Sequence, residues 1–220
     1  MATLIFDLDG TLIDSAPDIH AASNTVLVED GLAPMTLPEV RSFIGRGVPH
    51  LVACLLTAAG QDPAGPRHAR LVARFTDIYE EAVGLTVPYP GVVAALEALA
   101  AEGHRLGICT NKPLVPAQAV LRHLRLDRFF AVVKGGDSHP LKKPDPAPLL
   151  ATLAALGGPA LYIGDSEVDA ECAHRAGLTF LLFTEGYRKA PVDSLPHAAA
   201  FSDFAELPAL VAHSLAEVTG

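Results

Sequence analysis

The sequence predicts an α/β protein built on a doubly wound parallel sheet, with a helical domain inserted after the first strand. Two observations carry this prediction. From Val87 onward, short apolar runs alternate with longer amphipathic stretches, and near-continuous apolar strands alternating with helices are typical of a parallel sheet covered on both faces. By contrast, residues 16–86 contain no convincing strand but several segments with helical spacing.

The elements of the sheet domain follow from this alternation. We expect strands at the short apolar runs 3–6, 106–109, 131–133, 161–163 and 179–183. The helices expected between them and at the end of the chain are 92–101, 115–124, 147–156, 168–176 and 207–218. Gly103, Gly157 and Gly177 follow three of these helices, at the position where a left-handed residue commonly ends a helix.

Four helices are expected in the inserted stretch. Pro17 suits a first helical turn, and the run from Thr36 to Glu39 has the form of a capping box that opens a second helix. Two further helical segments, 48–59 and 67–83, each end just before a glycine. The expected domains are a core of residues 1–15 and 86–220 and a helical cap of residues 16–85.

Composition and charge limit the function. The 220 residues suffice for one α/β domain with an insert, and 16 basic against 25 acidic residues oppose binding to nucleic acid. No apolar run approaches the roughly 18 residues of a membrane-spanning helix. The three cysteines show no pairing or zinc pattern. We expect a cytoplasmic monomer or homodimer, with no membrane or nucleic-acid partner and a small molecule as ligand.

Two carboxylates follow the first predicted strand. Asp7 and Asp9 lie two residues apart, so a regular strand would point both side chains the same way, and Gly10 permits a sharp turn. Carboxylates gathered in a crevice repel one another unless a cation separates them, and hard oxygen ligands suit Mg²⁺. The alternative is a strand followed by a plain Asp-Gly turn.

A second acidic motif favours the metal site. Asp165 follows the strand predicted at 161–163, and Asp169 lies one helical turn later. Asp165 alone also fits a helix cap. Because open α/β sheets bind ligands at the carboxyl ends of their strands, two acidic motifs at such ends indicate a shared site.

Two further motifs suit a phosphate. Thr110 and Asn111 end the strand predicted at 106–109, where a hydroxyl and the N–H groups of a helix start can bind an anion. Lys143 precedes Pro144, which opens a helix, and its charge can hold phosphate oxygens. Taken singly, these motifs also fit an ordinary turn and a solvated lysine.

In this order, the motifs strongly resemble those of the haloacid-dehalogenase (HAD) superfamily of phosphatases. They read Asp7-Leu-Asp-Gly-Thr11, Thr110-Asn111, Lys143-Pro144 and Gly164-Asp-Ser-Glu-Val-Asp169. The resemblance covers essentially the whole chain, and the helical insert is similar to the superfamily's mobile cap. The runs 6–15, 88–91, 109–113, 135–137 and 143–146 look most like phosphoglycolate phosphatases. The resemblance therefore implies a Rossmann-like HAD core that hydrolyses a small phosphate ester such as 2-phosphoglycolate.

The resemblance also implies catalytic roles. Asp7 is expected to be the nucleophile that forms an aspartyl-phosphate. Asp9 is expected to protonate the leaving alcohol and then to activate water, while its backbone carbonyl binds Mg²⁺. Lys143 is expected to orient Asp7 and to neutralise phosphate charge. These roles agree with the physics, because a carboxylate approaches an anionic phosphate only where cations reduce the repulsion.

The remaining implied roles concern binding. Thr110 and Asn111 are expected to hold the phosphoryl group. Asp165 is expected to bind Mg²⁺ directly, as Asp7 does, and Asp169 to support the ion through water or a hydrogen bond. Arg46, between Gly45 and Gly47 in the insert, suits the substrate's carboxylate; the alternative is a solvated arginine in a turn.

Other functions share the core motifs. A sugar-phosphate phosphatase, a β-phosphoglucomutase-like mutase or a pyrophosphatase has the same core motifs, and the core does not separate them because substrate choice lies in the insert. A dehalogenase or a phosphonoacetaldehyde hydrolase departs from the pattern at Asp9. A phosphoaspartate signalling module has similar chemistry, but the insert and Asp9, placed to activate water, argue against it.

Overall fold

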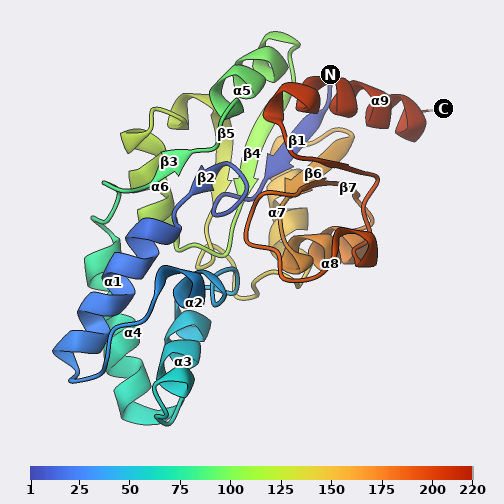
Figure 1. Cartoon of the computed structure of the whole chain (residues 1–220). Helices are drawn as coiled ribbons and strands as arrows, with labels where there is room; N and C mark the ends of the chain where they lie inside the picture. Colours follow the sequence, from blue (N-terminus) through green and yellow to red (C-terminus); the bar gives the residue numbers. More distant parts are fainter. Residues whose placement is uncertain (220) are drawn as a thin grey trace.

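The sheet domain contains six parallel strands in the order β5-β4-β1-β6-β7-β8, as seen in a computed structural model that describes residues 1–219 (Figure 1). The strands are β1 (Thr3–Phe6), β4 (Arg105–Cys109), β5 (Phe130–Lys134), β6 (Ala160–Gly164), β7 (Thr179–Phe183) and β8 (Ala199–Phe201). Five of them confirm the predicted apolar runs, and β8 was not predicted. Three residues carry too little pattern to identify a strand.

Helices cover both faces of this sheet. Leu4 and Phe6 of β1 pack into a hydrophobic cluster with one set of helices, whereas Ile5, between them, packs into a second cluster. The first set is α5 (Val92–Ala101), α6 (Leu114–His123) and α9 (Leu207–Thr219), and the second is α7 (Ala147–Leu156) and α8 (Glu167–Ala176). Because successive strand residues point to opposite faces, a sheet buried on both faces needs apolar residues at every position.

The insert is a group of four helices with a hydrophobic cluster of its own. The helices are α1 (Ala16–Glu29), α2 (Leu37–Arg41), α3 (Val48–Ala58) and α4 (Gly65–Tyr79). Leu27, Leu55 and Phe75 lie in a cluster that includes no residue of the sheet. The capping box is confirmed, since the Thr36 side chain accepts from Glu39 N and the Glu39 side chain accepts from Thr36 N. The domain limits at residues 15 and 86 stay a prediction.

Three local details differ from the expectations. A two-residue pair, β2 (Ile13–Asp14) with β3 (Val87–Pro88), joins the two crossings between sheet domain and insert. The helix α4 ends at Tyr79 rather than near residue 83. Pro144 does not open a helix, because Asp145 Oδ1 accepts a hydrogen bond from Ala147 N and closes a turn before α7.

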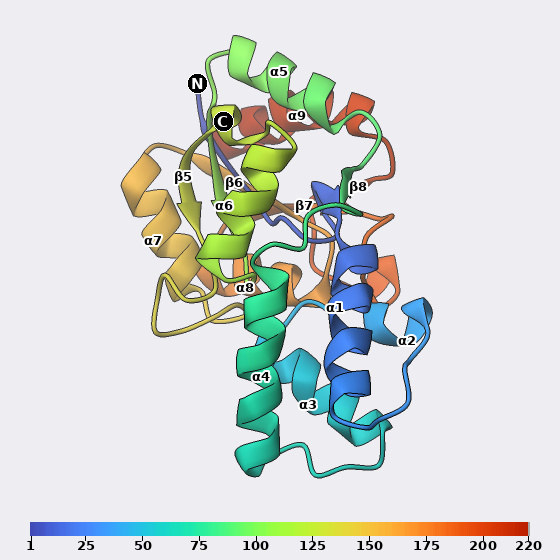
Figure 2. The same ribbon diagram turned by 90° about the vertical axis from the view of Figure 1, so that its left-hand side faces the viewer.

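The strand order places a crevice at the end of β1. From β1 the chain proceeds to β4 and β5 on one side, and then crosses back to β6, β7 and β8 on the other. Ligands of open α/β sheets bind where the winding reverses in this way. The insert extends beyond the carboxyl end of β1 (Figure 1), and the view turned by 90° shows its four helices together below the sheet domain (Figure 2). Among residues 1–219, no helix is long and apolar enough to cross a membrane.

Candidate active site

Three buried carboxylates meet at the crevice. Asp7 follows β1, Asp165 follows β6, and Asp169 lies in the first turn of α8. Their carboxylate oxygens include three, one from each residue, that all lie within 4.8 Å of one another. Gly10 permits this approach: its φ is +87°, and a Cβ there would lie 2.5 Å from Asp165 Oδ2. The structure thus brings Asp7 of the first acidic motif together with Asp165 and Asp169 of the second, while their role as a metal site stays a prediction.

Lys143 is the cation inside this cluster. Its Nζ lies 2.9 Å from Asp7 Oδ1 and 2.6 Å from Asp169 Oδ1, and it donates to the Tyr162 hydroxyl at 2.7 Å. Burial alone would lower the pKa of this ammonium, but Asp169 and Asp7 outweigh burial and raise the pKa. Lys143 therefore stays charged.

The pKa shifts of the three acids show that one ammonium does not balance them. Burial raises the pKa of Asp7 to about 7 although Lys143 opposes the shift. Burial, together with Asp169 and Asp7, raises the pKa of Asp165 well above its usual value. For Asp169 burial acts in the same direction, but Lys143 outweighs it and the pKa is lowered.

The cluster fits a divalent cation. Asp7 Oδ1 is buried and has no hydrogen-bond partner besides the ion pair with Lys143, and the ligand atoms offered are hard carboxylate oxygens, which Mg²⁺ prefers. The Asp9 side chain is not part of the cluster, so the spacing argument that placed the carboxylates of Asp7 and Asp9 together around a cation is not borne out; the resemblance implied the backbone carbonyl of Asp9 as the ligand. The choice of ligands stays a prediction.

Asp169 is held from several directions. Its Oδ1 accepts from Lys143 Nζ at 2.6 Å and from the Tyr162 hydroxyl at 2.7 Å. Its Oδ2 accepts from Ser166 Oγ at 2.5 Å and from Ser166 N at 3.2 Å, as part of a capping box at the start of α8. Ser166 is thus the N-cap, and the alternative that Asp165 caps this helix is wrong. With four hydrogen bonds made, Asp169 is suited to orienting Lys143.

Asp165 has two partners that the sequence reasoning missed. Thr11 Oγ1 donates to Asp165 Oδ1 at 2.7 Å, and Tyr187 N donates to Asp165 Oδ2 at 2.6 Å. The hydroxyl of Tyr187 accepts from Ser15 N and Ala16 N, where the chain enters the insert. Thr11 could have been found as the last residue of the first motif, whereas no local pattern points to Tyr187.

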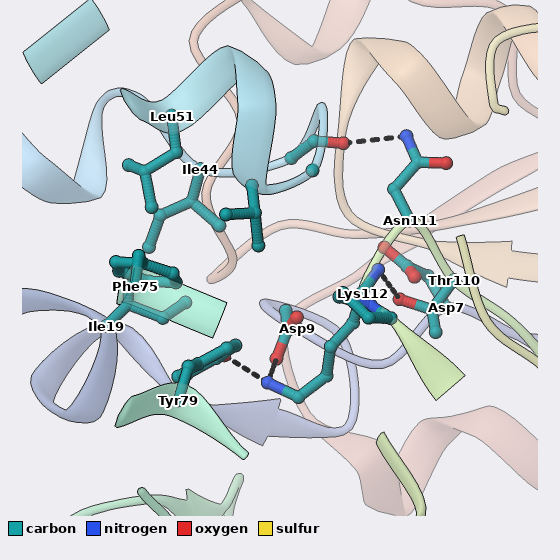
Figure 3. A pocket seen from close by; sticks show the side chains of 14 residues that line it. Asp7, Asp9, Ile19, Ile44, Leu51, Phe75, Tyr79, Thr110, Asn111 and Lys112 are labelled. Atoms are coloured by element: carbon teal, nitrogen blue, oxygen red, sulfur yellow. Dashed lines mark hydrogen bonds and ion pairs between the residues drawn. The ribbon is translucent and has the colours of Figure 1, made fainter. Parts of the chain in front are cut away.

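A pocket lies between this cluster and the insert. Asp7, Asp9, Thr110, Asn111 and Lys112 line it from the sheet domain (Figure 3). The insert contributes an apolar wall, which consists of Ile19, Ile44, Val48, Leu51 and Phe75. The pocket therefore has one charged side and one apolar side.

Asp9 lies beside a second buried lysine. Its Oδ1 accepts from Ser15 Oγ at 2.6 Å and from Lys112 Nζ at 3.2 Å. Lys112 also donates to the hydroxyl of Tyr79, the last residue of α4 (Figure 3). Burial lowers the pKa of Lys112 even though Asp9 favours its charge. Lys112 lies within the run 109–113 that resembles phosphoglycolate phosphatases, but no role was predicted for it from the sequence.

The predicted phosphate-binding pair also lines the pocket. Asn111 Nδ2 donates to Gly45 O at 3.0 Å and to Lys143 O at 2.9 Å, and its Oδ1 accepts from Lys143 N at 3.0 Å. The Asn111 side chain therefore ties the Lys143 loop to the insert. Thr110 Oγ1 accepts from Lys112 N at 3.2 Å. Phosphate binding by Thr110 and Asn111 stays a prediction.

Arg46 lies apart from these residues. Gly45 and Gly47 on either side of it line the pocket, but Arg46 itself is exposed and is not among the lining residues. The structure therefore does not bring Arg46 together with Asp7, Asp9 and Lys143, and its contact with substrate stays a prediction.

Comparisons with known proteins agree with this geometry. The model of the haloacid dehalogenase-like hydrolases matches residues 4–183, a range that contains every predicted site residue. The phosphoglycolate phosphatase of Rhodobacter capsulatus is 53% identical over 209 residues, which cover 94% of this chain and 95% of that protein. The phosphoglycolate phosphatase of Rhodospirillum rubrum is 45% identical over 214 residues, which cover 93% and 88%.

A solved structure extends the likeness to three dimensions. The predicted phosphoglycolate phosphatase of Haemophilus somnus superposes with a TM-score of 0.90 at 30% identity, and the match covers 96% of this chain and 98% of that chain. Sequence and fold thus lead to the same group of proteins. The matched family model, the shared fold and the acidic cluster with its lysine together establish that this chain belongs to the haloacid dehalogenase-like hydrolase family.

Proposed function

We propose that this protein is a Mg²⁺-dependent phosphatase that hydrolyses 2-phosphoglycolate to glycolate and phosphate. The observation that supports it most is a pocket lined by both Asp7 and Asp9, with Lys143 Nζ 2.9 Å from Asp7 Oδ1. Similarity over most of the chain to enzymes named phosphoglycolate phosphatase supports 2-phosphoglycolate as the substrate. A cytoplasmic location and a monomeric or dimeric state remain predictions.

The first half of the proposed reaction transfers the phosphoryl group to Asp7. One Asp7 oxygen attacks phosphorus while the bond to the ester oxygen breaks, and Asp9 donates a proton to that leaving oxygen. Attack needs an ionised Asp7, and the Lys143 ammonium favours this form. Glycolate leaves, and Asp7 carries the phosphoryl group.

The second half regenerates the enzyme. Asp9, now ionised, accepts a proton from a water molecule, which attacks phosphorus and breaks its bond to Asp7. Phosphate leaves, and Asp9 holds the proton for the next cycle. Ser15 Oγ and Lys112 Nζ both bond Asp9 Oδ1, so the carboxylate is held in one orientation between the two steps.

Asp7, Asp165 and the backbone carbonyl of Asp9 are the residues we propose to hold Mg²⁺, with Asp169 supporting the site. When bound, the ion reduces the repulsion between the Asp7 carboxylate and the anionic phosphate. Thr11 and Tyr187 fix both oxygens of Asp165, so this ligand is oriented before the ion binds.

Multiple-turnover phosphate release from a panel of esters tests the proposal. The panel contains 2-phosphoglycolate, a hexose phosphate, pyrophosphate and an aryl phosphate, each with Mg²⁺ and with a chelator. We expect the highest kcat/KM for 2-phosphoglycolate, loss of activity with the chelator, and recovery when Mg²⁺ is restored. A preference for another ester, or release that stops after one equivalent, would contradict the proposal.

A further inference from the structure

We infer that Lys112 binds the carboxylate of the substrate's leaving group and so sets the preference for phosphorylated hydroxy acids over neutral phosphate esters. The inference rests on the proposed function and extends it, because it assigns the recognition of the substrate's distal charge to a residue outside the metal and phosphate site.

The charges around the pocket single out this residue. Among the described residues that line the pocket, only Lys112 carries a positive charge. Lys143 is bonded to Asp169 and Tyr162 beside Asp7, where the phosphoryl group reacts. Arg46 is exposed outside the lining. The other side of the pocket is apolar, so it offers an anionic group no partner.

The position of Lys112 matches the shape of the substrate. In 2-phosphoglycolate a single methylene separates the ester oxygen from the carboxylate. The ester oxygen must lie beside Asp9, which is proposed to protonate it, and the carboxylate must therefore lie within a few ångströms of Asp9. Lys112 Nζ is 3.2 Å from Asp9 Oδ1, on this leaving-group side of the pocket (Figure 3).

Lys112 also has capacity for another acceptor. An ammonium group has three N–H donors. Asp9 Oδ1 and the Tyr79 hydroxyl accept from Lys112, which leaves one donor for a ligand. The side chain of Lys112 is only 3% exposed, and a carboxylate in so little water would form a strong, charge-assisted hydrogen bond.

The neutral partners explain why a carboxylate is favoured over a hydroxyl. Tyr79 supplies an uncharged oxygen, and its ring centroid lies 4.0 Å from Lys112 Nζ. Asp9 is the one carboxylate to which Lys112 is bonded, and in the proposed first step it is protonated. During that step the ammonium has no ionised carboxylate in direct contact unless the substrate provides one.

A comparison of two esters tests the inference. The second ester is 2-hydroxyethyl phosphate, in which a neutral hydroxymethyl group replaces the carboxylate. We expect Lys112→Met to lower the ratio of kcat/KM for 2-phosphoglycolate to that for 2-hydroxyethyl phosphate by about 10- to 100-fold, in line with loss of a charged hydrogen bond. Both activities fall because Asp9 loses a partner, so the ratio is the readout.

Control variants distinguish the loss of the Lys112 charge from a general loss of folding or activity. Lys142→Met removes an exposed lysine whose ammonium lies near Gly47 but which does not itself line the pocket, and it should leave the ratio unchanged. Lys112→Arg keeps the charge and should retain most of the ratio. If Lys112→Met does not fold, Lys112→Gln provides the same comparison with a neutral side chain.

The outcomes distinguish the inference from the function on which it rests. If the wild type prefers 2-phosphoglycolate but Lys112→Met keeps its ratio, or if Arg46→Ala causes the loss instead, the inference is overturned and the proposed function stands. If the wild type favours neither ester over a hexose phosphate, both the function and the inference are wrong.

Discussion

Two buried lysines lie next to the aspartates of the site, Lys143 beside Asp7 and Lys112 beside Asp9, and they differ in what surrounds them. As whole residues, Lys143 is 4% exposed and Lys112 is 6% exposed, so burial opposes the positive charge of both side chains. Lys143 contacts the carboxylates of Asp7 and Asp169, and its pKa is raised. Lys112 contacts the carboxylate of Asp9 and a neutral tyrosine, and its pKa is lowered.

The difference lies in how fully each charge is satisfied by the protein itself. Around Lys143 the three carboxylates of Asp7, Asp165 and Asp169 outnumber the single ammonium, so a further cation would be bound favourably there. Around Lys112 a single carboxylate, that of Asp9, is in contact, and the proposed first step has it protonated, so this position favours an anionic ligand. A substrate with phosphate at one end and carboxylate at the other complements both needs, and mutations on the two sides should have different consequences.

The largest effect is expected on the Lys143 side, from Asp7→Asn. The amide cannot form the aspartyl-phosphate, and kcat should fall by about 10⁵-fold or more, as when another covalent enzyme loses its nucleophile. Steady-state and single-turnover phosphate release would measure the loss. A matched circular dichroism spectrum would exclude misfolding, and near-full activity would show that Asp7 is not the nucleophile.

Replacing each lysine in turn compares how much the two ion pairs contribute to the free energy of unfolding. Lys143→Met leaves buried carboxylates without their cation, and the free energy of unfolding should fall by about 3–5 kcal/mol. Lys112→Met leaves one carboxylate, which Ser15 still bonds, and should cost about 1–3 kcal/mol. Urea unfolding in the presence of a chelator would measure both. Equal losses would mean that the number of carboxylates does not distinguish the two sites.

The smallest effect is expected from Tyr79→Phe, which sharpens the comparison. The substitution removes one neutral acceptor from Lys112 and leaves Asp9 in place, so the free energy of unfolding should fall by only about 1 kcal/mol. Thermal unfolding would detect this loss. A fall as large as that for Lys112→Met would assign the stability of this side to Tyr79 rather than to the ion pair.

The acidic cluster could be predicted from sequence because its members follow apolar strands. The runs 3–6 and 161–163 identify β1 and β6, and parallel neighbours bring the residues that follow them to one edge of the sheet. The capping box at Thr36 was equally visible, since its hydrogen bonds join residues three apart. Local patterns sufficed wherever the contact was local or the sheet fixed the geometry.

The contacts on the insert side could not be predicted in this way. Lys112 meets Tyr79 only because the end of α4 packs over the loop after β4, and neither residue has a local pattern that reveals the other. Arg46 is the opposite case, because it has a local sequence pattern but makes no contact in the site. Its flanking glycines were visible, but the direction of its side chain depends on how α2 and α3 pack, and the structure places it in solvent.

Tyr187 links the proposed metal-site aspartate to the insert, which matters for any attempt to change specificity by exchanging the insert with that of a relative. Its backbone N–H holds Asp165, and its hydroxyl accepts from Ser15 N and Ala16 N and donates to Asp14. Arg41 of α2 lies over the tyrosine ring, 4.9 Å from its centroid, and also donates to Gly186 O.

A chimera cut at residues 15 and 86 would thus separate Arg41 from the ring that it covers, although the ring lies far outside the exchanged segment. The loop 184–188 contacts both parts of such a chimera, since Tyr187 bonds Asp165 in the sheet domain and packs under Arg41 of the insert. A graft should therefore either keep arginine at the position of Arg41 or transfer this loop together with the four helices. Otherwise an exchange meant to alter substrate choice would also disturb the aspartate intended for the metal.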